Sequence, residues 1–133
     1  FNKNNIPEKG YYIIQQYIKP DSKQTTYRII TNFHNNKVNF LEAYLLYNNK
    51  IVTNISQGGT KKNINFISPE LKRAIRQCII AHKQITYQHS CNTIGWDIII
   101  RNKKLYFLEG NIGVSVDNKD YIKYVNVFYK NYV

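Results

Sequence analysis

Two acidic residues and an asparagine stand on two short apolar runs near the carboxyl end of the chain. Asp97 lies in the run 95–100, and Glu109 and Asn111 lie in the run 106–111. Acids are scarce, since the chain has only eight of them. The residues between the two runs are turn-prone, and this pattern predicts an antiparallel β-hairpin with one acid on each strand.

The register of this hairpin decides whether the three polar side chains meet. With a three-residue loop, Arg101 pairs with Leu105, and Asp97 then lies directly opposite Glu109. Because side chains alternate between the faces of a strand, Asp97, Glu109 and Asn111 project from one face. Two carboxylates and an amide oxygen are hard ligands suited to Mg²⁺, which would relieve the repulsion between opposed acids. The alternative is a solvated hairpin with two incidental acids.

The composition is that of one globular domain, residues 1–133, with a basic balance. The chain is 43% hydrophobic and 20% charged, which suits a single core. A formal charge of +11 favours phosphate-rich partners such as nucleic acids. The basic residues are scattered, however, and the densest group lies on one face of a predicted helix: Lys72, Arg73 and Arg76. The twelve tyrosines interleave with Ile and Val at strand spacing, which suits sheet packing better than base stacking.

Several features bear on the compartment and on the origin of the chain. No apolar run approaches the length of a membrane span, and no amino-terminal signal pattern is present. Cys78 and Cys91 match no metal-finger spacing, and Cys78 falls on an apolar helix face, so a buried free thiol and a cytoplasmic location are expected. The chain contains no methionine and opens with Phe1, so we expect it to be part of a longer protein.

The hydrophobic pattern predicts strands followed by a helix, the hairpin and a second helix. Strands are expected at 11–18, 25–33 and 38–47, and a polar, glycine-bearing loop is expected at 53–62. A closing helix is expected at 119–129. This order predicts an α+β fold in which two helices pack on a mainly antiparallel sheet.

The first helix has clear start signals and one apolar face. Ser68 can cap the free amides, Pro69 suits the first helical position, and Glu70 lies near the positive end. Apolar residues and one histidine then recur at helical spacing and predict a buried stripe. Its members are Leu71, Ile75, Cys78, Ile79 and His82.

The acidic hairpin resembles the metal-binding hairpin of the ATP-grasp superfamily. There an Asp on one strand and a Glu-x-Asn triplet on the next hold the magnesium ions that bridge the nucleotide phosphates. The segments Ile-Gly-Trp-Asp at 94–97 and Phe-Leu-Glu-Gly-Asn at 107–111 are most similar to the sugar-transfer-associated or polysaccharide-biosynthesis branch. The resemblance implies Mg²⁺ ligands at Asp97, Glu109 and Asn111, and a fold like the C-terminal ATP-grasp subdomain.

An earlier segment resembles the ATP-grasp strand that binds adenine through its backbone. The resemblance assigns this role to Gln16, Tyr17 and Ile18. Asp21 matches the acid that accepts the ribose hydroxyls. The alternative for this segment is an edge strand ended by Pro20.

Two further segments follow in the family's order. Arg28 resembles the strand arginine that reaches the transferred phosphate, a task suited to its planar, always charged fork. Asn54, four residues before Gly58-Gly59, resembles the asparagine that contacts the reacting group in the family's Asn-x-x-x-Gly-Gly stretch. A surface ion pair for Arg28 and a plain turn for the glycines are the alternatives.

The resemblance implies an ATP- and Mg²⁺-dependent ligase that activates a small carboxylate as an acyl-phosphate for attack by an amine or another nucleophile. Such chemistry depends on positioning and charge neutralisation. No segment before Tyr11 matches the lysines and glycine-rich loop of the family's N-terminal half, so we expect the isolated chain to be inactive. The other functions considered are a degenerate ATP-grasp module for binding or assembly and a basic nucleic-acid-binding domain.

Overall fold

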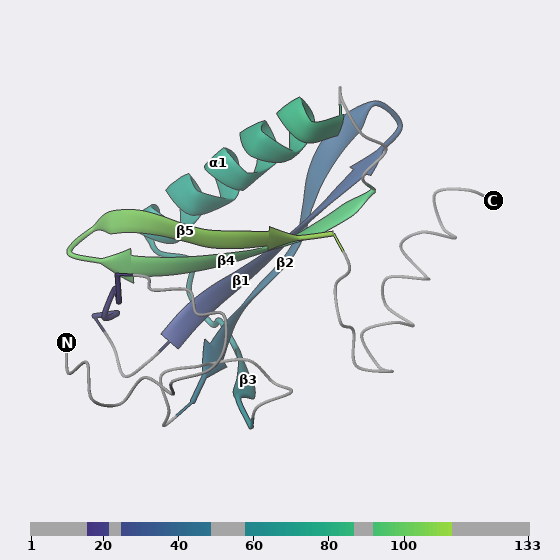
Figure 1. Cartoon of the computed structure of the whole chain (residues 1–133). Helices are drawn as coiled ribbons and strands as arrows, with labels where there is room; N and C mark the ends of the chain where they lie inside the picture. The colour runs from purple at the N-terminus through teal and green to yellow at the C-terminus, as the bar shows by residue number, and fades with distance from the viewer. Residues whose placement is uncertain (1–15, 22–24, 49–57, 87–91, 113–133) are drawn as a thin grey trace, which may run out of the picture.

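The computed structural model describes residues 16–21, 25–48, 58–86 and 92–112. Its elements are β1 (Thr25–His34), β2 (Lys37–Tyr47), β3 (Thr60–Asn63), α1 (Pro69–Thr86), β4 (Thr93–Arg101) and β5 (Lys104–Asn111). The five strands form one antiparallel sheet in the order β3-β2-β1-β4-β5, and α1 lies along one face of it (Figure 1). The predicted α+β fold with a mainly antiparallel sheet is confirmed.

The described ranges contain one helix instead of the two expected. The second expected helix, 119–129, lies outside them. Among the described residues no helix has both the length and the apolar composition that crossing a bilayer requires.

Two local expectations are wrong. Residues 16–18 were expected at the end of a strand, but they belong to no strand of the sheet, and Tyr17 is 51% exposed. Thr60–Asn63 was expected to lie almost entirely in a loop, but it forms β3 and pairs with the edge of β2. A ladder of backbone hydrogen bonds does not require apolar side chains, so the polar sequence of β3 conceals the strand.

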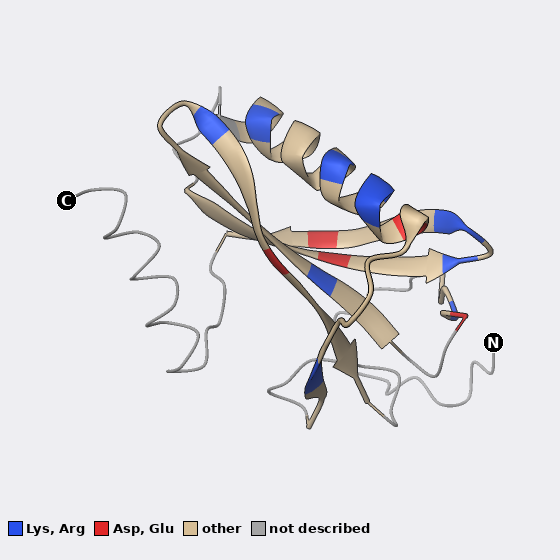
Figure 2. Cartoon of the chain, turned by 180° about the vertical axis from the view of Figure 1, so that it is seen from behind, with Lys and Arg blue, Asp and Glu red and all other residues tan. Residues whose placement is uncertain are grey.

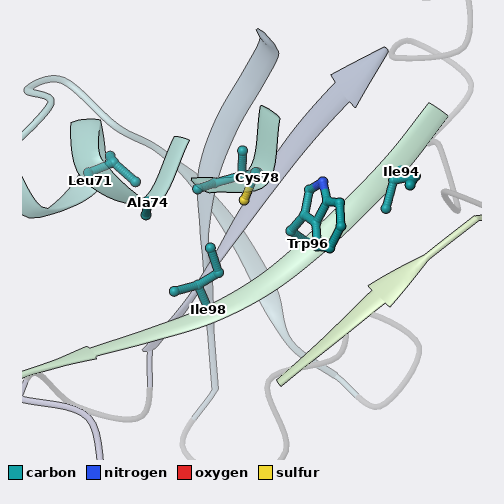
Figure 3. Packing of buried hydrophobic residues seen from close by; sticks show 7 residues of the cluster. Leu71, Ala74, Cys78, Ile94, Trp96 and Ile98 are labelled. Atoms are coloured by element: carbon teal, nitrogen blue, oxygen red, sulfur yellow. The ribbon is translucent and has the colours of Figure 1, made fainter. Parts of the chain in front are cut away.

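The larger core cluster lies between α1 and the sheet, and a smaller one lies on the opposite face, formed by Ile30, Tyr44 and Leu46. Alternation along β1 and β4 turns Ile29 and Ile98 toward the helix, where they meet Leu71 and Cys78. Figure 3 shows the labelled side chains of the helix and of β4 gathered in this layer. The predicted helix stripe is confirmed, since its members are buried or half-buried, and Ala74 also belongs to it.

The start of α1 follows its sequence signals. Ser68 Oγ accepts a hydrogen bond from the Leu71 amide at 3.1 Å, and the Ser68 carbonyl accepts one from Lys72 N at 2.9 Å. Pro69 is the first helical residue, as predicted. The basic residues of the outer face, Lys72, Arg73 and Arg76, are exposed. Figure 2 shows basic positions in blue along α1.

Thr31 joins three elements inside the core. Its Oγ1 accepts a hydrogen bond from Trp96 Nε1 at 2.8 Å and lies 2.7 Å from His82 Nδ1. Thr31 and His82 are fully buried. This contact fixes β1 to β4 and to α1 with a directional bond that apolar packing alone does not provide.

Replacing Thr31 with Val should destabilise the fold by about 1–3 kcal/mol, because the buried Trp96 N–H would lose its acceptor. Urea unfolding followed by circular dichroism measures this cost. In a Trp96→Phe background the same substitution should cost less, since no indole N–H remains to be left unpaired. Equal costs in both backgrounds would show that the Trp96–Thr31 bond contributes nothing to stability.

Cys78 should resist thiol reagents while the chain is folded. Burial raises the pKa of the Cys78 thiol to about 12, so little thiolate exists at neutral pH. In a Cys91→Ser variant, which isolates this thiol, modification should be slower than in urea by roughly a hundredfold or more. A thiol-reactive chromogenic reagent measures the rate, and comparable rates in buffer and in urea would contradict the prediction.

Candidate functional site

The turn of the β4–β5 hairpin is one residue shorter than the sequence indicates. Arg101 pairs with Lys104, so the loop consists of Asn102 and Lys103. Both have left-handed backbones, with φ of 48° and 60°, as in the type I′ turns that match the twist of hairpin strands. The expected three-residue loop, with Arg101 opposite Leu105, is therefore wrong.

A β-bulge restores the register that the longer loop would have produced. The pairing shifts between Asp97 and Ile98, and Leu108 is the extra residue on β5. Asp97 therefore lies opposite Glu109, as predicted, whereas an uninterrupted ladder would place Leu108 there. Because a slip of one residue turns side chains to the other face, the bulge lets Glu109 share a face with Asp97.

These side chains project from the face of the sheet opposite α1. Trp96 and Ile98, the neighbours of Asp97 along β4, pack in the core against the helix, so alternation directs Asp97 the other way. Arg28 lies across the β1–β4 ladder from Asp97, and Glu109 lies across the β4–β5 ladder. Figure 2 shows acidic positions side by side on β4 and β5, with a basic position on β1.

Arg28 and Asp97 form a buried ion pair. Arg28 Nη2 donates to Asp97 Oδ2 at 2.8 Å, and Arg28 Nε donates to Oδ1 of the same carboxylate. Each residue is 7% exposed. One planar guanidinium thus engages both Asp97 oxygens, the geometry in which arginine binds a carboxylate most strongly. The sequence suggested a phosphate ligand or a surface ion pair, and the ion pair found is buried.

Glu109 and Asn111 extend this group along β5. Asn111 Nδ2 donates to Glu109 Oε1 at 2.9 Å, and this bond is the main cause that lowers the pKa of Glu109. Burial is the main cause that raises the pKa of Asp97; Glu109 raises it further, and Arg28 opposes both. When both carboxyls are ionised, two negative charges face one guanidinium, so the group has one negative charge in excess and favours a cation.

The oxygen donors of this group are of the kind that binds Mg²⁺. Both carboxylate oxygens of Asp97, however, already accept hydrogen bonds from Arg28. Magnesium usually takes one or two carboxylates and completes its shell with water and phosphate oxygens. Asn111 turns its amide nitrogen to Glu109, so its carbonyl oxygen is the atom that could contact a cation. Within the described ranges, no group of three or more His, Cys, Asp or Glu side chains is placed to hold a metal ion.

The glycine between Glu109 and Asn111 is a packing requirement that the sequence did not reveal. A Cβ at Gly110 would lie 3.0 Å from Trp96 Cζ3 and 3.1 Å from Trp96 Cε3. The indole cannot readily move away, because its Nε1 is bonded to Thr31 on the next strand. The spacing of the two polar residues on β5 is therefore tied to the core on the other side of the sheet.

Lys61 is a second cationic residue on the same face, and it falls within 53–62, where a polar loop was expected. It lies opposite Leu46 in the β2–β3 ladder. Its Nζ is 3.6 Å from Glu42 Oε1 and 4.2 Å from the centre of the Tyr44 ring. The sequence of β3 is polar throughout and has no hydrophobic alternation. It therefore predicts neither the strand nor the partial burial of Lys61.

The residues assigned to adenine and ribose lie away from this group. Asp21 Oδ2 accepts a hydrogen bond from the Asn102 backbone at 2.7 Å, and so contacts the hairpin turn. Asn102 is five residues beyond Asp97, roughly 16 Å along a strand that rises ~3.3 Å per residue. Gln16 and Tyr17 are exposed, and Ile18 is half-buried.

The remaining assigned residue, Asn54, lies outside the described residues. The glycine pair that follows it is described, and Gly58 has a φ of +86°, a backbone conformation that glycine adopts at little cost. The structure therefore brings together Arg28, Asp97, Glu109 and Asn111 from the assigned residues.

The Arg28–Asp97 pair can be tested by a double-mutant cycle. Arg28→Met alone should destabilise the chain by about 3–5 kcal/mol, because it leaves Asp97 charged and unpaired in a buried position. Asp97→Leu alone should cost a similar amount, and the double variant should cost less than either single variant. Urea unfolding measures all three, and additive costs would show that the two side chains are not coupled.

The chain matches no protein-family model and no curated protein with which it was compared. Function is therefore inferred from the residues of the site and from their geometry.

Proposed function

We propose that this chain supplies the metal-binding half of an ATP-grasp carboxylate ligase. In this proposal Mg²⁺ and ATP activate a small carboxylate as an acyl-phosphate, which an amine or another nucleophile then attacks. The N-terminal half of the ATP-grasp unit is the implied partner, and the cytoplasm is the proposed location. The hairpin residues suggest a role of the kind found in the polysaccharide-biosynthesis branch.

One observation carries the proposal. Asp97 lies opposite Glu109 across two adjacent strands, and Asn111 contacts Glu109 from the same face. Opposed carboxylates repel, and a single arginine balances only one of them. A cation explains this arrangement together with the Glu-Gly-Asn spacing, whereas a purely structural ion pair requires neither Glu109 nor Asn111.

The proposed roles follow from the chemistry of each side chain. Bound Mg²⁺ would neutralise charge on the phosphates during transfer. Asp97, Glu109 and Asn111 would hold it through oxygen atoms. Arg28 would hold two oxygens of the transferring group with its fork.

The adenine and the ribose of the nucleotide would lie toward the turn of the β4–β5 hairpin. The backbone of residues 16–18 would provide a donor and an acceptor for adenine, and Asp21 would accept the ribose hydroxyls. Asp21 would then exchange its bond with the Asn102 amide for one with the ribose. Asn54 would contact the reacting group.

A second candidate is a degenerate ATP-grasp module that binds or assembles without catalysis. The observation that favours it is the Arg28–Asp97 pair, in which both carboxylate oxygens and the arginine fork are already used. In such a module the pair would be a permanent part of the fold. The two candidates differ in whether Glu109 and Asn111 affect nucleotide binding.

Calorimetric titration with Mg·ATP separates these candidates when the chain is combined with the N-terminal half of the unit. Glu109→Gln and Asn111→Ala should each weaken binding by about tenfold or more, since each removes a contact to the cation. Glu70→Gln is the matched control, because it removes one negative charge on α1 without touching the site, and it should leave affinity unchanged. Unchanged affinity in both site variants would reject the ligase proposal in favour of the second candidate.

A further inference from the structure

We propose that Arg28 makes the cation and the phosphate chain bind together. Its guanidinium binds both Asp97 oxygens until an anion binds the guanidinium in their place. Only then can Asp97 become a ligand for Mg²⁺. This inference rests on the proposed function and adds an order of assembly to it. Neither Mg²⁺ alone nor a polyphosphate alone should bind tightly.

The geometry of the pair excludes a cation from Asp97. Nη2 and Nε of Arg28 donate to the two different oxygens of that carboxylate. A divalent ion on the same oxygens would lie next to a guanidinium in a buried setting, where like charges repel strongly because little water screens them. The Arg28 contact and a cation contact at Asp97 are therefore alternatives.

Arg28 cannot leave Asp97 without a replacement anion. Both residues are 7% exposed, and separating a buried ion pair leaves two uncompensated charges. Phosphate oxygens match the arginine fork as well as a carboxylate does. When an anion binds Arg28 and a cation binds Asp97 in the same event, every buried charge keeps a partner.

Glu109 differs from Asp97 in a way that supports this order. It is exposed, and its side-chain partners are the Asn111 amide and the Asp97 carboxyl instead of an arginine. A cation arriving alone would meet one available carboxylate and one amide oxygen, too few contacts for tight binding. Another cationic residue on this face, Lys61, is paired with Glu42.

The coupling has a reciprocal consequence. If the polyphosphate raises the affinity for the cation by some factor, the cation must raise the affinity for the polyphosphate by the same factor. Couplings of this kind are commonly about 5–150-fold. We expect each ligand to raise the affinity for the other by about tenfold or more, because both partners of one buried ion pair are exchanged.

The first test observes Arg28 in the unmodified chain by NMR of the arginine Nε–H signals. The chain has four arginines, and the Arg28 signal is identified by through-bond assignment of the unmodified chain. Magnesium chloride alone and sodium tripolyphosphate alone should leave this signal in place. The two salts together should shift the Arg28 signal. They should do so at concentrations about tenfold lower than those at which either salt alone begins to shift it.

The outcomes of this test separate the two proposals. If Glu109 and Asn111 amide signals respond to magnesium tripolyphosphate while the Arg28 signal does not, the coupling is wrong and the proposed function stands. If none of these signals responds, the proposed function fails as well. A shift of Arg28 with tripolyphosphate alone, at the concentration that suffices for the mixture, would also overturn the coupling.

The second test replaces the planar guanidinium of Arg28 with an ammonium group that has the same charge. Arg28→Lys can contact Asp97 but cannot hold both oxygens with a planar group, so Mn²⁺ alone should bind this variant about tenfold tighter than the original chain. Arg101→Lys, at the exposed end of β4, is the matched control and should not change Mn²⁺ affinity. Electron paramagnetic resonance measures free Mn²⁺, and equal affinities in the three proteins would overturn the inference. If circular dichroism shows that Arg28→Lys does not fold, the NMR titration decides.

Discussion

The register of β4 between its two neighbours is the constraint on which the site depends. It places Asp97 across from Arg28 on one side and from Glu109 on the other. A slip of one residue would turn Asp97 into the apolar layer under α1, where a charged carboxylate has no partner. The Trp96–Thr31 hydrogen bond holds the same pair of strands from the opposite face, so the core and the charged group support one alignment.

Both faces of the sheet contain buried apolar residues, and the charged group lies on the face opposite α1, where Ile30, Tyr44 and Leu46 form a second cluster. The face under α1 contains a packed cluster with a buried polar contact at Thr31, which fixes the strands. The other face contains an ion pair, a second carboxylate and an amide on adjacent strands. Side chains held by strands keep their geometry better than side chains on loops. A charge excess on such a rigid surface is a reason to expect a ligand, because relaxation of the backbone cannot disperse it.

Much of the fold follows from local sequence patterns. The predictions that were wrong, at β3 and at the hairpin loop, each have a physical reason. The cap at Ser68 and the stripe on α1 were predictable because capping and helical spacing act within a few residues. β3 was not predictable, since its pairing with β2 depends on backbone groups that every residue has. The hairpin illustrates both effects: turn preference selected a two-residue loop at Asn102, and a bulge at Leu108 compensated for it. The predicted pairing of Asp97 with Glu109 was therefore correct although the predicted loop was not.

The sequence by itself determined that Asp97, Glu109 and Asn111 lie on one hairpin, because a turn between two short apolar runs acts over neighbouring residues. Glu109 shares a face with Asp97 only because of the bulge at Leu108, which the sequence did not predict. Only the tertiary structure decided that Arg28, 69 residues before Asp97 in the chain, is its partner. It also decided that Asp21 contacts the hairpin turn. The physical reason is that the hydrophobic pattern tells which face of a strand is buried, whereas the order of strands in the sheet is set by packing of the whole layer against α1.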